Sequence, residues 1–257
     1  SLGAEIREDG CCVQARAGRL AGGTIRLPYP SVGATENALL AAALADGDTV
    51  ILGAAREPEI EELCRFINAM GGEVSGGGTG RIRIRGKKKL HGCRFQAPGD
   101  RIVAGTYLMA AMAGRGEVEL AGVRPEHLKE VIRTLERAGA VFDISETAVT
   151  VSMAGRPLPL QVETGPYPGF PTDLQSPVMG LLCCASGVSR IRETVFEGRY
   201  ETAAELEKLG ASVTVREGEA LVRGRPVLRG GRAGDRDLRG GAALVVAGLA
   251  AEGETEI

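Results

Sequence analysis

An internal repeat of about 70 residues constrains the fold of this 257-residue chain more than any other feature of its sequence. Stretches that begin at Gly33, Arg101 and Asp173 each read as an Ala/Leu-rich helix, a short strand, an amphipathic helix and a further strand. The glycines that end the first and the second helices recur at the same period: Gly47, Gly116 and Gly187, then Gly71, Gly139 and Gly210. Two independent sets of markers therefore agree on one repeating unit.

Each repeat is predicted to be an α/β (α+β) unit of the βαβαββ kind, counted from the strand that enters it. The second helices carry apolar residues at helical spacing, as Ile60, Cys64 and Ile67 show. Two short strands joined by a turn follow, in "GEVSGGGTGRIRIRG", "AVFDISETAVTVSM" and "ASVTVREGEALVRG". Because the helices are largely apolar, several units must pack their helices together to complete a core.

Partial repeats lie at both ends of the chain. Residues 2–20 match the tail of the third repeat, and the stretch that ends at Ile257 matches only the head of a repeat. We therefore expect the chain to be a fragment of a longer protein.

Composition argues against several classes of protein. The net charge of −2 is not that of a strongly basic nucleic-acid-binding protein, and no apolar run approaches the roughly 18 residues of a membrane span. The six cysteines form no CxxC pair, and two histidines are too few for a typical zinc site or a histidine-based triad. We expect reduced, mostly buried thiols, no metal and no cofactor.

Three motifs that suggest ligands have ordinary structural interpretations. "SGGGTG" (75–80) lacks the Lys-Ser/Thr of a phosphate loop and falls at the turn of a predicted hairpin. "RIRIRGKKKLHG" (81–92) alternates as a strand with isoleucines inward and arginines in solvent. "EPEIEE" (57–62) places acids and a proline where a helix begins.

The corners that lead into the first helix of each unit are polar in all four places: "PSVGATEN", "PGDRIVAGT", "GFPTDLQSP" and "DRDLRGGA". Ordinary helix capping is the favoured interpretation for any single corner, because Ser31, Asp100, Thr172, Asp173 and Asp237 are all good N-cap residues. Four such corners, two of them with an arginine (Arg101 and Arg239), together favour an anion or carboxylate site between sheets.

Four of the nine aromatic residues lie in one short window of the sequence: Tyr167, Phe170, Phe196 and Tyr200. A ligand with a planar ring would use such a cluster, and an aromatic core patch explains it equally well.

The motifs "SVGATEN", "DRIVAGTYL", "YPGFPTDLQ", "ETVFEGR" and "DLRGGAALVVAGLAAEGET" resemble, in order and over essentially the whole chain, the UDP-N-acetylglucosamine 1-carboxyvinyltransferase family. The resemblance implies two domains of inverse βαβαββ units around a cleft, as in 5-enolpyruvylshikimate-3-phosphate synthase. On this basis residues 1–98 are the later part of the first domain, and residues 99–257 are most of the second.

The resemblance also implies an activity. The family transfers the enolpyruvyl group of phosphoenolpyruvate to the 3-hydroxyl of UDP-N-acetylglucosamine and releases phosphate, the first committed step of peptidoglycan synthesis. It implies a cytoplasmic, monomeric parent with small-molecule partners, and neither nucleic acid nor membrane. Two alternatives stay open: a relative that acts on shikimate 3-phosphate, and a non-catalytic paralogue that binds a nucleotide sugar.

Family roles carry over to particular residues of this sequence. Asp173 resembles the acid that contacts the sugar hydroxyl and serves as general base, and Arg199 and Arg239 resemble catalytic arginines that stabilise anionic groups. The substrate-binding residues implied by the resemblance, besides Asp173, are Tyr29, Pro30, Ser31, Val32, Gly33, Val195 and Phe196.

The chain departs from the family pattern at three positions. Gly198 stands where asparagine is usual, Tyr29 where lysine or arginine is frequent, and Val103 where glutamate is usual. The family's Lys-Asn pair, its mobile loop with a reactive cysteine and a late arginine are expected before Ser1 and after Ile257. We therefore expect the 257 residues alone to be inactive, and none of the six cysteines is assigned as catalytic.

Overall fold

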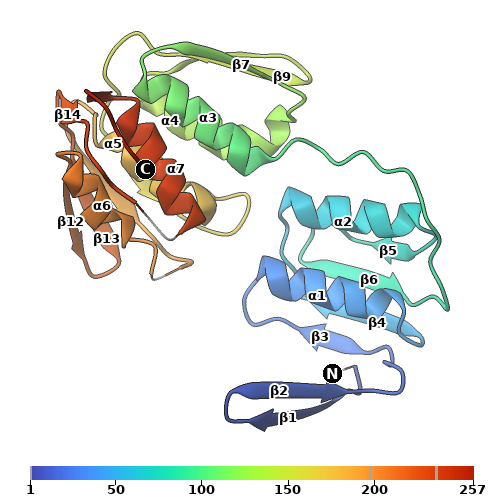
Figure 1. The fold of residues 1–257 in the computed structure, drawn as a ribbon. Helices are drawn as coiled ribbons and strands as arrows, with labels where there is room; N and C mark the ends of the chain where they lie inside the picture. The colour runs from blue at the N-terminus through green and yellow to red at the C-terminus, as the bar shows by residue number, and fades with distance from the viewer. Residues whose placement is uncertain (1, 197, 235–236) are drawn as a thin grey trace. The chain divides into compact units, whose positions relative to one another are not determined.

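The computed structural model describes residues 2–196, 198–234 and 237–257. The chain divides into two compact units, Ser1–Ala97 and Pro98–Ile257, each built from the repeat (Figure 1).

The first unit contains one complete repeat and a hairpin that precedes it. The hairpin pairs β1 (Glu5–Asp9) with β2 (Cys12–Arg16). The repeat runs through β3 (Thr24–Arg26), α1 (Val32–Ala43), β4 (Asp48–Leu52), α2 (Pro58–Ala69), β5 (Glu73–Ser75) and β6 (Arg81–Arg85). Its sheet has the order β3-β4-β6-β5, with β3 parallel to β4 and the other pairs antiparallel.

The second unit contains two repeats and the head of another. The first of these comprises α3 (Arg101–Ala113), β7 (Glu117–Ala121), the 3₁₀ turn η1 (Pro125–Leu128), α4 (Lys129–Arg137), β8 (Val141–Ile144) and β9 (Ala148–Ser152). The next comprises β10 (Gln161–Glu163), η2 (Thr172–Leu174), α5 (Gln175–Leu182), β11 (Val188–Arg192), α6 (Thr202–Lys208), β12 (Ser212–Arg216) and β13 (Glu219–Arg223). The head comprises β14 (Leu228–Arg229), α7 (Leu238–Gly248) and β15 (Ala251–Glu252).

The predicted βαβαββ unit is confirmed in both complete repeats. The sheet order β10-β11-β13-β12 repeats that of the first unit strand for strand, again with the first pair parallel. The middle repeat differs from the prediction, because its sheet β7-β9-β8 has no entering strand among the described residues. The chain there connects one unit to the other, and residues 86–100 form no strand.

The predicted packing of helices from several repeats is confirmed within the second unit. The first helices α3, α5 and α7 contact one another (Figure 1), and one buried cluster joins residues from all of them. The contact between α5 and α7 is close at Gly180, where a Cβ atom would lie 2.4 Å from the carbonyl oxygen of Ala243. Only glycine permits this separation.

The structure also agrees with the predictions made from short sequence motifs for a strand, a turn and helix ends. Ile82 and Ile84 are fully buried on β6 while Arg81, Arg83 and Arg85 are exposed, and the "SGGGTG" stretch is the turn between β5 and β6. Pro58 opens α2 with acids in its first turn. The glycines after the second helices, Gly71, Gly139 and Gly210, all have positive φ, which explains why the repeat places glycine there.

The expectation that the thiols are mostly buried is wrong for half of them. Cys64, Cys183 and Cys184 are buried, and burial raises the pKa of Cys64 to about 11. The exposed cysteines lie in the β1–β2 hairpin (Cys11 and Cys12) and in the segment that leads out of the first unit (Cys93). Both strands of the hairpin are exposed along their whole length, and residues 91–97 are exposed as well.

Thr49 of β4 has a fully buried hydroxyl that finds no hydrogen-bond partner among the described residues. Replacing it with valine, which has the same shape, is expected to raise the free energy of unfolding by about 1 kcal/mol, because an unsatisfied buried hydroxyl is removed. Urea denaturation measures the change. A destabilised Thr49→Val variant would show that the hydroxyl is satisfied in solution.

Among the described residues, no helix is long and apolar enough to cross a membrane.

Candidate functional site: a carboxylate held between two arginines

Three of the four polar corners are ordinary helix caps. The Ser31 hydroxyl accepts the N–H of Ala34 at 3.3 Å at the start of α1. The Asp100 carboxylate accepts the N–H groups of two residues at the start of α3, and Asp237 accepts the N–H of Gly240 at 2.9 Å at the start of α7. Capping, the favoured interpretation for each single corner, is confirmed at these three.

The corner at Asp173 is different, and capping is wrong for it. The chain enters α5 through the 3₁₀ turn η2, and no side chain caps η2 or α5. The Thr172 hydroxyl, the other candidate cap, donates instead to Glu193 Oε2 at 2.9 Å. Because the first turn is 3₁₀, the Asp173 carboxylate is left to interact with side chains from other elements.

Two arginines bind the Asp173 carboxylate, one at each of its two oxygens. Arg199 Nη2 lies 2.6 Å from Oδ1, and Arg239 Nη2 lies 3.0 Å from Oδ2. The Arg199 and Arg239 side chains are 16% and 25% exposed and that of Asp173 is 36% exposed, so the cluster is half-buried and open to a ligand. All three residues named in the sequence as catalytic candidates therefore meet at one point.

The two arginines come from different repeats. Arg199 lies in the turn between β11 and α6 and also donates from Nη1 to the Thr172 carbonyl oxygen at 2.8 Å. Arg239 lies in the first turn of α7, next to α5 in the packed helices. The site thus depends on the contact between the third repeat and the head of the fourth.

Val195 and Phe196 lie in the same region, in the segment that connects β11 to Arg199. Phe196 is 61% exposed, and the Arg199 guanidinium carbon lies 5.3 Å from the centre of its ring. Glu197, in the motif "ETVFEGR", and the first two residues of "DRDLRGGA" lie outside the described residues.

Of the four clustered aromatic residues, two belong to the core and two have ring surface open to a ligand. Phe170 and Tyr200 are buried in the core. Phe196 is exposed, and Tyr167 is half-buried with the Arg101 guanidinium 5.7 Å from its ring centre. Only the last two have ring surface that a ligand can reach.

Sequence reasoning missed one residue of this region. Glu193 follows β11 and is only 8% exposed, yet it was not distinguished from the many surface glutamates of the chain. Its Oε1 accepts the Thr164 hydroxyl at 2.8 Å and the N–H groups of Val195 and Phe196 at 2.7 and 2.9 Å. The signal that could have found it is its place at the carboxyl end of a parallel strand, where sites are frequent in α/β sheets.

Tyr200 is expected to make the free energy of unfolding depend on pH in the alkaline range. Burial raises the pKa of Tyr200 to about 12, and its oxygen accepts the Glu193 N–H at 2.9 Å and lies 2.8 Å from the Gly218 carbonyl oxygen. The folded protein therefore keeps the phenolic proton at pH values where the unfolded chain, with a pKa of about 10, loses it. The stabilisation of the folded state by the protonated Tyr200 is fully present below pH about 10 and is lost as pH rises to about 12.

We expect the free energy of unfolding of the wild type to fall between pH about 10 and 12 more steeply than that of Tyr200→Phe. Urea denaturation at several pH values in this window compares the two slopes. Equal slopes would show that Tyr200 titrates alike in both states.

The remaining predicted residues lie in the first unit, around the start of α1. Tyr29 is 42% exposed, Pro30, Ser31 and Val32 are half-buried, and Gly33 is exposed. Buried Thr35 fixes this loop from below: its hydroxyl donates to the Ser31 carbonyl oxygen at 2.8 Å and accepts the Ala55 N–H at 3.0 Å. The loop is accessible and rigidly supported.

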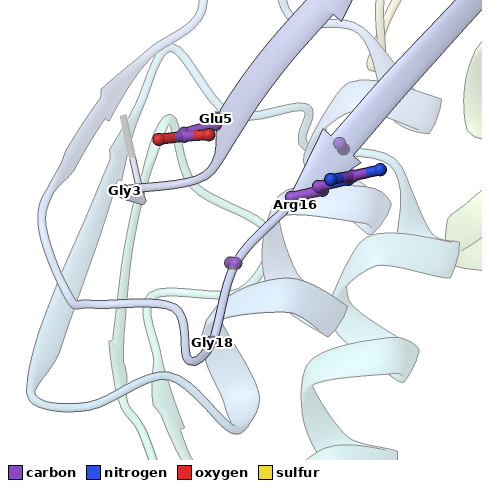
Figure 2. Close-up of a pocket in the computed structure, with 6 residues that line it drawn as sticks. Gly3, Glu5, Arg16 and Gly18 are labelled. Atoms are coloured by element: carbon purple, nitrogen blue, oxygen red, sulfur yellow. The ribbon is translucent and has the colours of Figure 1, made fainter.

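A pocket in the first unit does not involve any of these residues. Figure 2 shows it beside the β1–β2 hairpin, lined by Gly3, Glu5, Ala15, Arg16, Ala17 and Gly18. No group of three or more potential metal ligands occurs among the described residues. The arginine-held carboxylate and the accessible α1 corner are therefore the two places where the predicted site residues lie.

Comparison with known proteins agrees with the resemblance seen in the motifs. UDP-N-acetylglucosamine 1-carboxyvinyltransferase of Rhodospirillum centenum is 47% identical over 262 residues, covering 100% of this chain and 60% of the relative. The protein of that name from Nocardia farcinica is 45% identical over 256 residues, again covering 100% and 60%. The chain thus spans about three fifths of the length of these curated relatives.

The fold and the family are also shown. The crystal structure of the enolpyruvyl transferase NikO from Streptomyces tendae superposes with a TM-score of 0.85 at 27% identity, covering 99% of this chain and 63% of that one. The EPSP synthase (3-phosphoshikimate 1-carboxyvinyltransferase) family matches residues 1–257. The chain belongs to this family of enolpyruvyl transferases.

Proposed function

We propose that this chain is part of an enzyme that transfers the enolpyruvyl group of phosphoenolpyruvate to the 3-hydroxyl of UDP-N-acetylglucosamine, in cytoplasmic peptidoglycan synthesis by a monomeric protein. The observation that carries the proposal is the Asp173 carboxylate, which is released from helix capping and held by Arg199 and Arg239 at 2.6 and 3.0 Å. Relatives 44–47% identical over the chain that bear the name of this activity support it.

Asp173 is the proton acceptor of the proposed reaction. The 3-hydroxyl oxygen forms a bond to C2 of the enolpyruvyl group, the bond from C2 to the phosphate oxygen breaks, and the hydroxyl proton passes to Asp173. Two guanidinium groups contact the carboxylate, one at each of its oxygens. Their hydrogen bonds fix the direction in which its lone pairs point.

Arg199 and Arg239 have a second role in this proposal. The reaction involves a carboxylate and a phosphate on one substrate and expels inorganic phosphate. Guanidinium groups that are already ordered and partly dehydrated stabilise such anions without having to reorganise. Each arginine keeps further N–H donors beyond those bonded to Asp173, because a guanidinium has five.

We assign the loop Tyr29–Gly33 to the diphosphate of the nucleotide. The first turn of α1 has no acidic residue, whereas the first turn of α2 has Glu59 and Glu61. Of these two helix N-termini, α1 is therefore the one whose partial positive charge suits an anion. The exposed Gly33 lets a ligand approach the backbone closely.

Ligand binding and turnover test the proposal. We expect calorimetry to detect UDP-N-acetylglucosamine binding to the full-length gene product that contains this sequence, and to detect no binding of shikimate 3-phosphate. Phosphate release from phosphoenolpyruvate should require UDP-N-acetylglucosamine. We expect the 257 residues alone to release none, because they span about three fifths of the relatives.

The alternatives give different results. Preferential binding of shikimate 3-phosphate would assign the chain to the other activity that the family name describes. Tight UDP-N-acetylglucosamine binding without phosphate release by the full-length protein would indicate a non-catalytic paralogue. Robust phosphate release by the 257 residues would refute their expected inactivity.

A further inference from the structure

We propose that Glu193 is a positioning residue, whose carboxylate clamps the Val195–Phe196 segment to the Thr172–Asp173 corner. The inference rests on the proposed function for its catalytic consequence, since Asp173 is the proposed base and the resemblance implies that Val195 and Phe196 bind substrate. Its structural part, the clamp itself, stands on contacts within the second unit.

Glu193 lies at the point where two parallel strands end. Thr164 directly follows β10 and Glu193 directly follows β11, and the two strands are paired in parallel. The Thr164 hydroxyl donates to Glu193 Oε1 at 2.8 Å and accepts the N–H of Thr194 at 3.0 Å. The ends of both strands are therefore fastened to each other through side chains as well as through the sheet.

The two oxygens of the Glu193 carboxylate bind two different segments. Oε1 accepts the N–H groups of Val195 and Phe196, which forces the chain to turn back over the carboxylate after β11. Oε2 accepts the hydroxyl of Thr172, the residue before Asp173. One side chain thus bonds to both segments, and the Thr172 carbonyl oxygen is fixed in addition by Arg199 at 2.8 Å.

The residue type fits this arrangement. Four donors point at the two oxygens of one side chain, and a carboxylate offers acceptors only. A glutamine would present an amide in place of Oε2, so the Thr172 hydroxyl would have to reverse, and every remaining bond would lose its charge assistance. An alanine would leave four donors in a buried place with no acceptor from this side chain.

Four variants separate positioning from general stability: Glu193→Gln, Glu193→Ala, Thr172→Val and, as a matched control, Glu163→Gln. Glu163 is an exposed glutamate of the adjacent strand β10, 3.5 Å from Arg192. Each is made in the full-length protein and measured by hydrogen exchange of the Val195 and Phe196 amides, by thermal unfolding, and by steady-state kinetics with UDP-N-acetylglucosamine and phosphoenolpyruvate.

We expect Glu193→Ala to speed exchange of the Val195 and Phe196 amides at least tenfold and to lower kcat/KM about a hundredfold. Glu193→Gln should have an intermediate effect and lower kcat/KM about tenfold relative to the wild type. Thr172→Val should lower kcat about fivefold to tenfold but leave amide exchange at Val195 and Phe196 unchanged, because only the Oε2 contact is removed. The Glu163→Gln control should match the wild type in all three measurements.

Three results would overturn the proposal. Unchanged amide exchange in a folded Glu193→Gln or Glu193→Ala protein would show that there is no clamp. Lower thermal stability with wild-type kcat and KM in the folded fraction would show a purely structural role. An effect of Glu163→Gln equal to that of Glu193→Gln would show a nonspecific charge effect. If the wild type does not bind UDP-N-acetylglucosamine, the proposed function fails, and amide exchange alone still decides whether the clamp exists.

Discussion

Replacing Asp173 with asparagine is expected to lower kcat of the full-length enzyme about 10²- to 10⁴-fold, the usual contribution of a general base. The amide keeps the size of the side chain and one acceptor oxygen, and it loses the ability to take the hydroxyl proton. The two half-buried ion pairs lost with the charge should change the free energy of unfolding by only about 1 kcal/mol. The loss should therefore appear in turnover far more than in stability.

Phosphate release at saturating substrates measures this loss, and urea denaturation checks the fold. Asp143→Asn is a matched control, because Asp143 is an exposed aspartate on β8 of the same unit. Turnover within about threefold of the wild type in Asp173→Asn would assign the base to another residue. Loss of UDP-N-acetylglucosamine binding with kcat unchanged would make Asp173 a binding residue only.

Gly180→Ala is expected to destabilise the second unit by about 2 kcal/mol, even though alanine is the better helix former. A Cβ at Gly180 would lie 2.4 Å from the backbone carbonyl oxygen of Ala243, so α5 and α7 would have to separate. Because Asp173 precedes α5 and Arg239 lies on α7, the same shift should lengthen the contact between them and lower activity.

Gly105→Ala on α3 provides the comparison. A Cβ there would lie 2.5 Å from Leu174 Cδ1, the movable end of a side chain, rather than from backbone. We expect its free energy of unfolding to stay within about 1 kcal/mol of the wild type, since the gain in helix propensity offsets limited repacking. Urea denaturation of both variants tests this difference. Equal destabilisation would mean that the contact of Gly180 with the backbone of α7 tolerates a Cβ no less well than the contact of Gly105 with the Leu174 side chain.

Much of the fold followed from short-range features of the sequence. The period of the glycines located the repeats, and the stops of the second helices recur because Gly71, Gly139 and Gly210 all have positive φ, which favours glycine. Alternation predicted the buried face of β6, and capping residues marked where α1, α3 and α7 begin. The same rules failed at Thr172 and Asp173, where the local residue types permit capping but the chain forms a 3₁₀ turn and the side chains bond elsewhere.

The site depended on contacts that no local pattern contains. The motif resemblance named Asp173, Arg199 and Arg239 as candidates, but it did not say that they touch. Glu193 had no motif at all, and it stands out only because its carboxylate is buried among four donors from three separate segments.

The sequence by itself determined the repeating βαβαββ unit, the order of its elements and the family to which the chain belongs. These depend on periodicity, turn chemistry and motifs, which act over a few residues at a time. Only the tertiary structure decided that Asp173 is not a cap and that an arginine 66 residues further along the chain reaches it. That pairing arises from the packing of α5 against α7, and it is a property of how the repeats assemble rather than of any one of them.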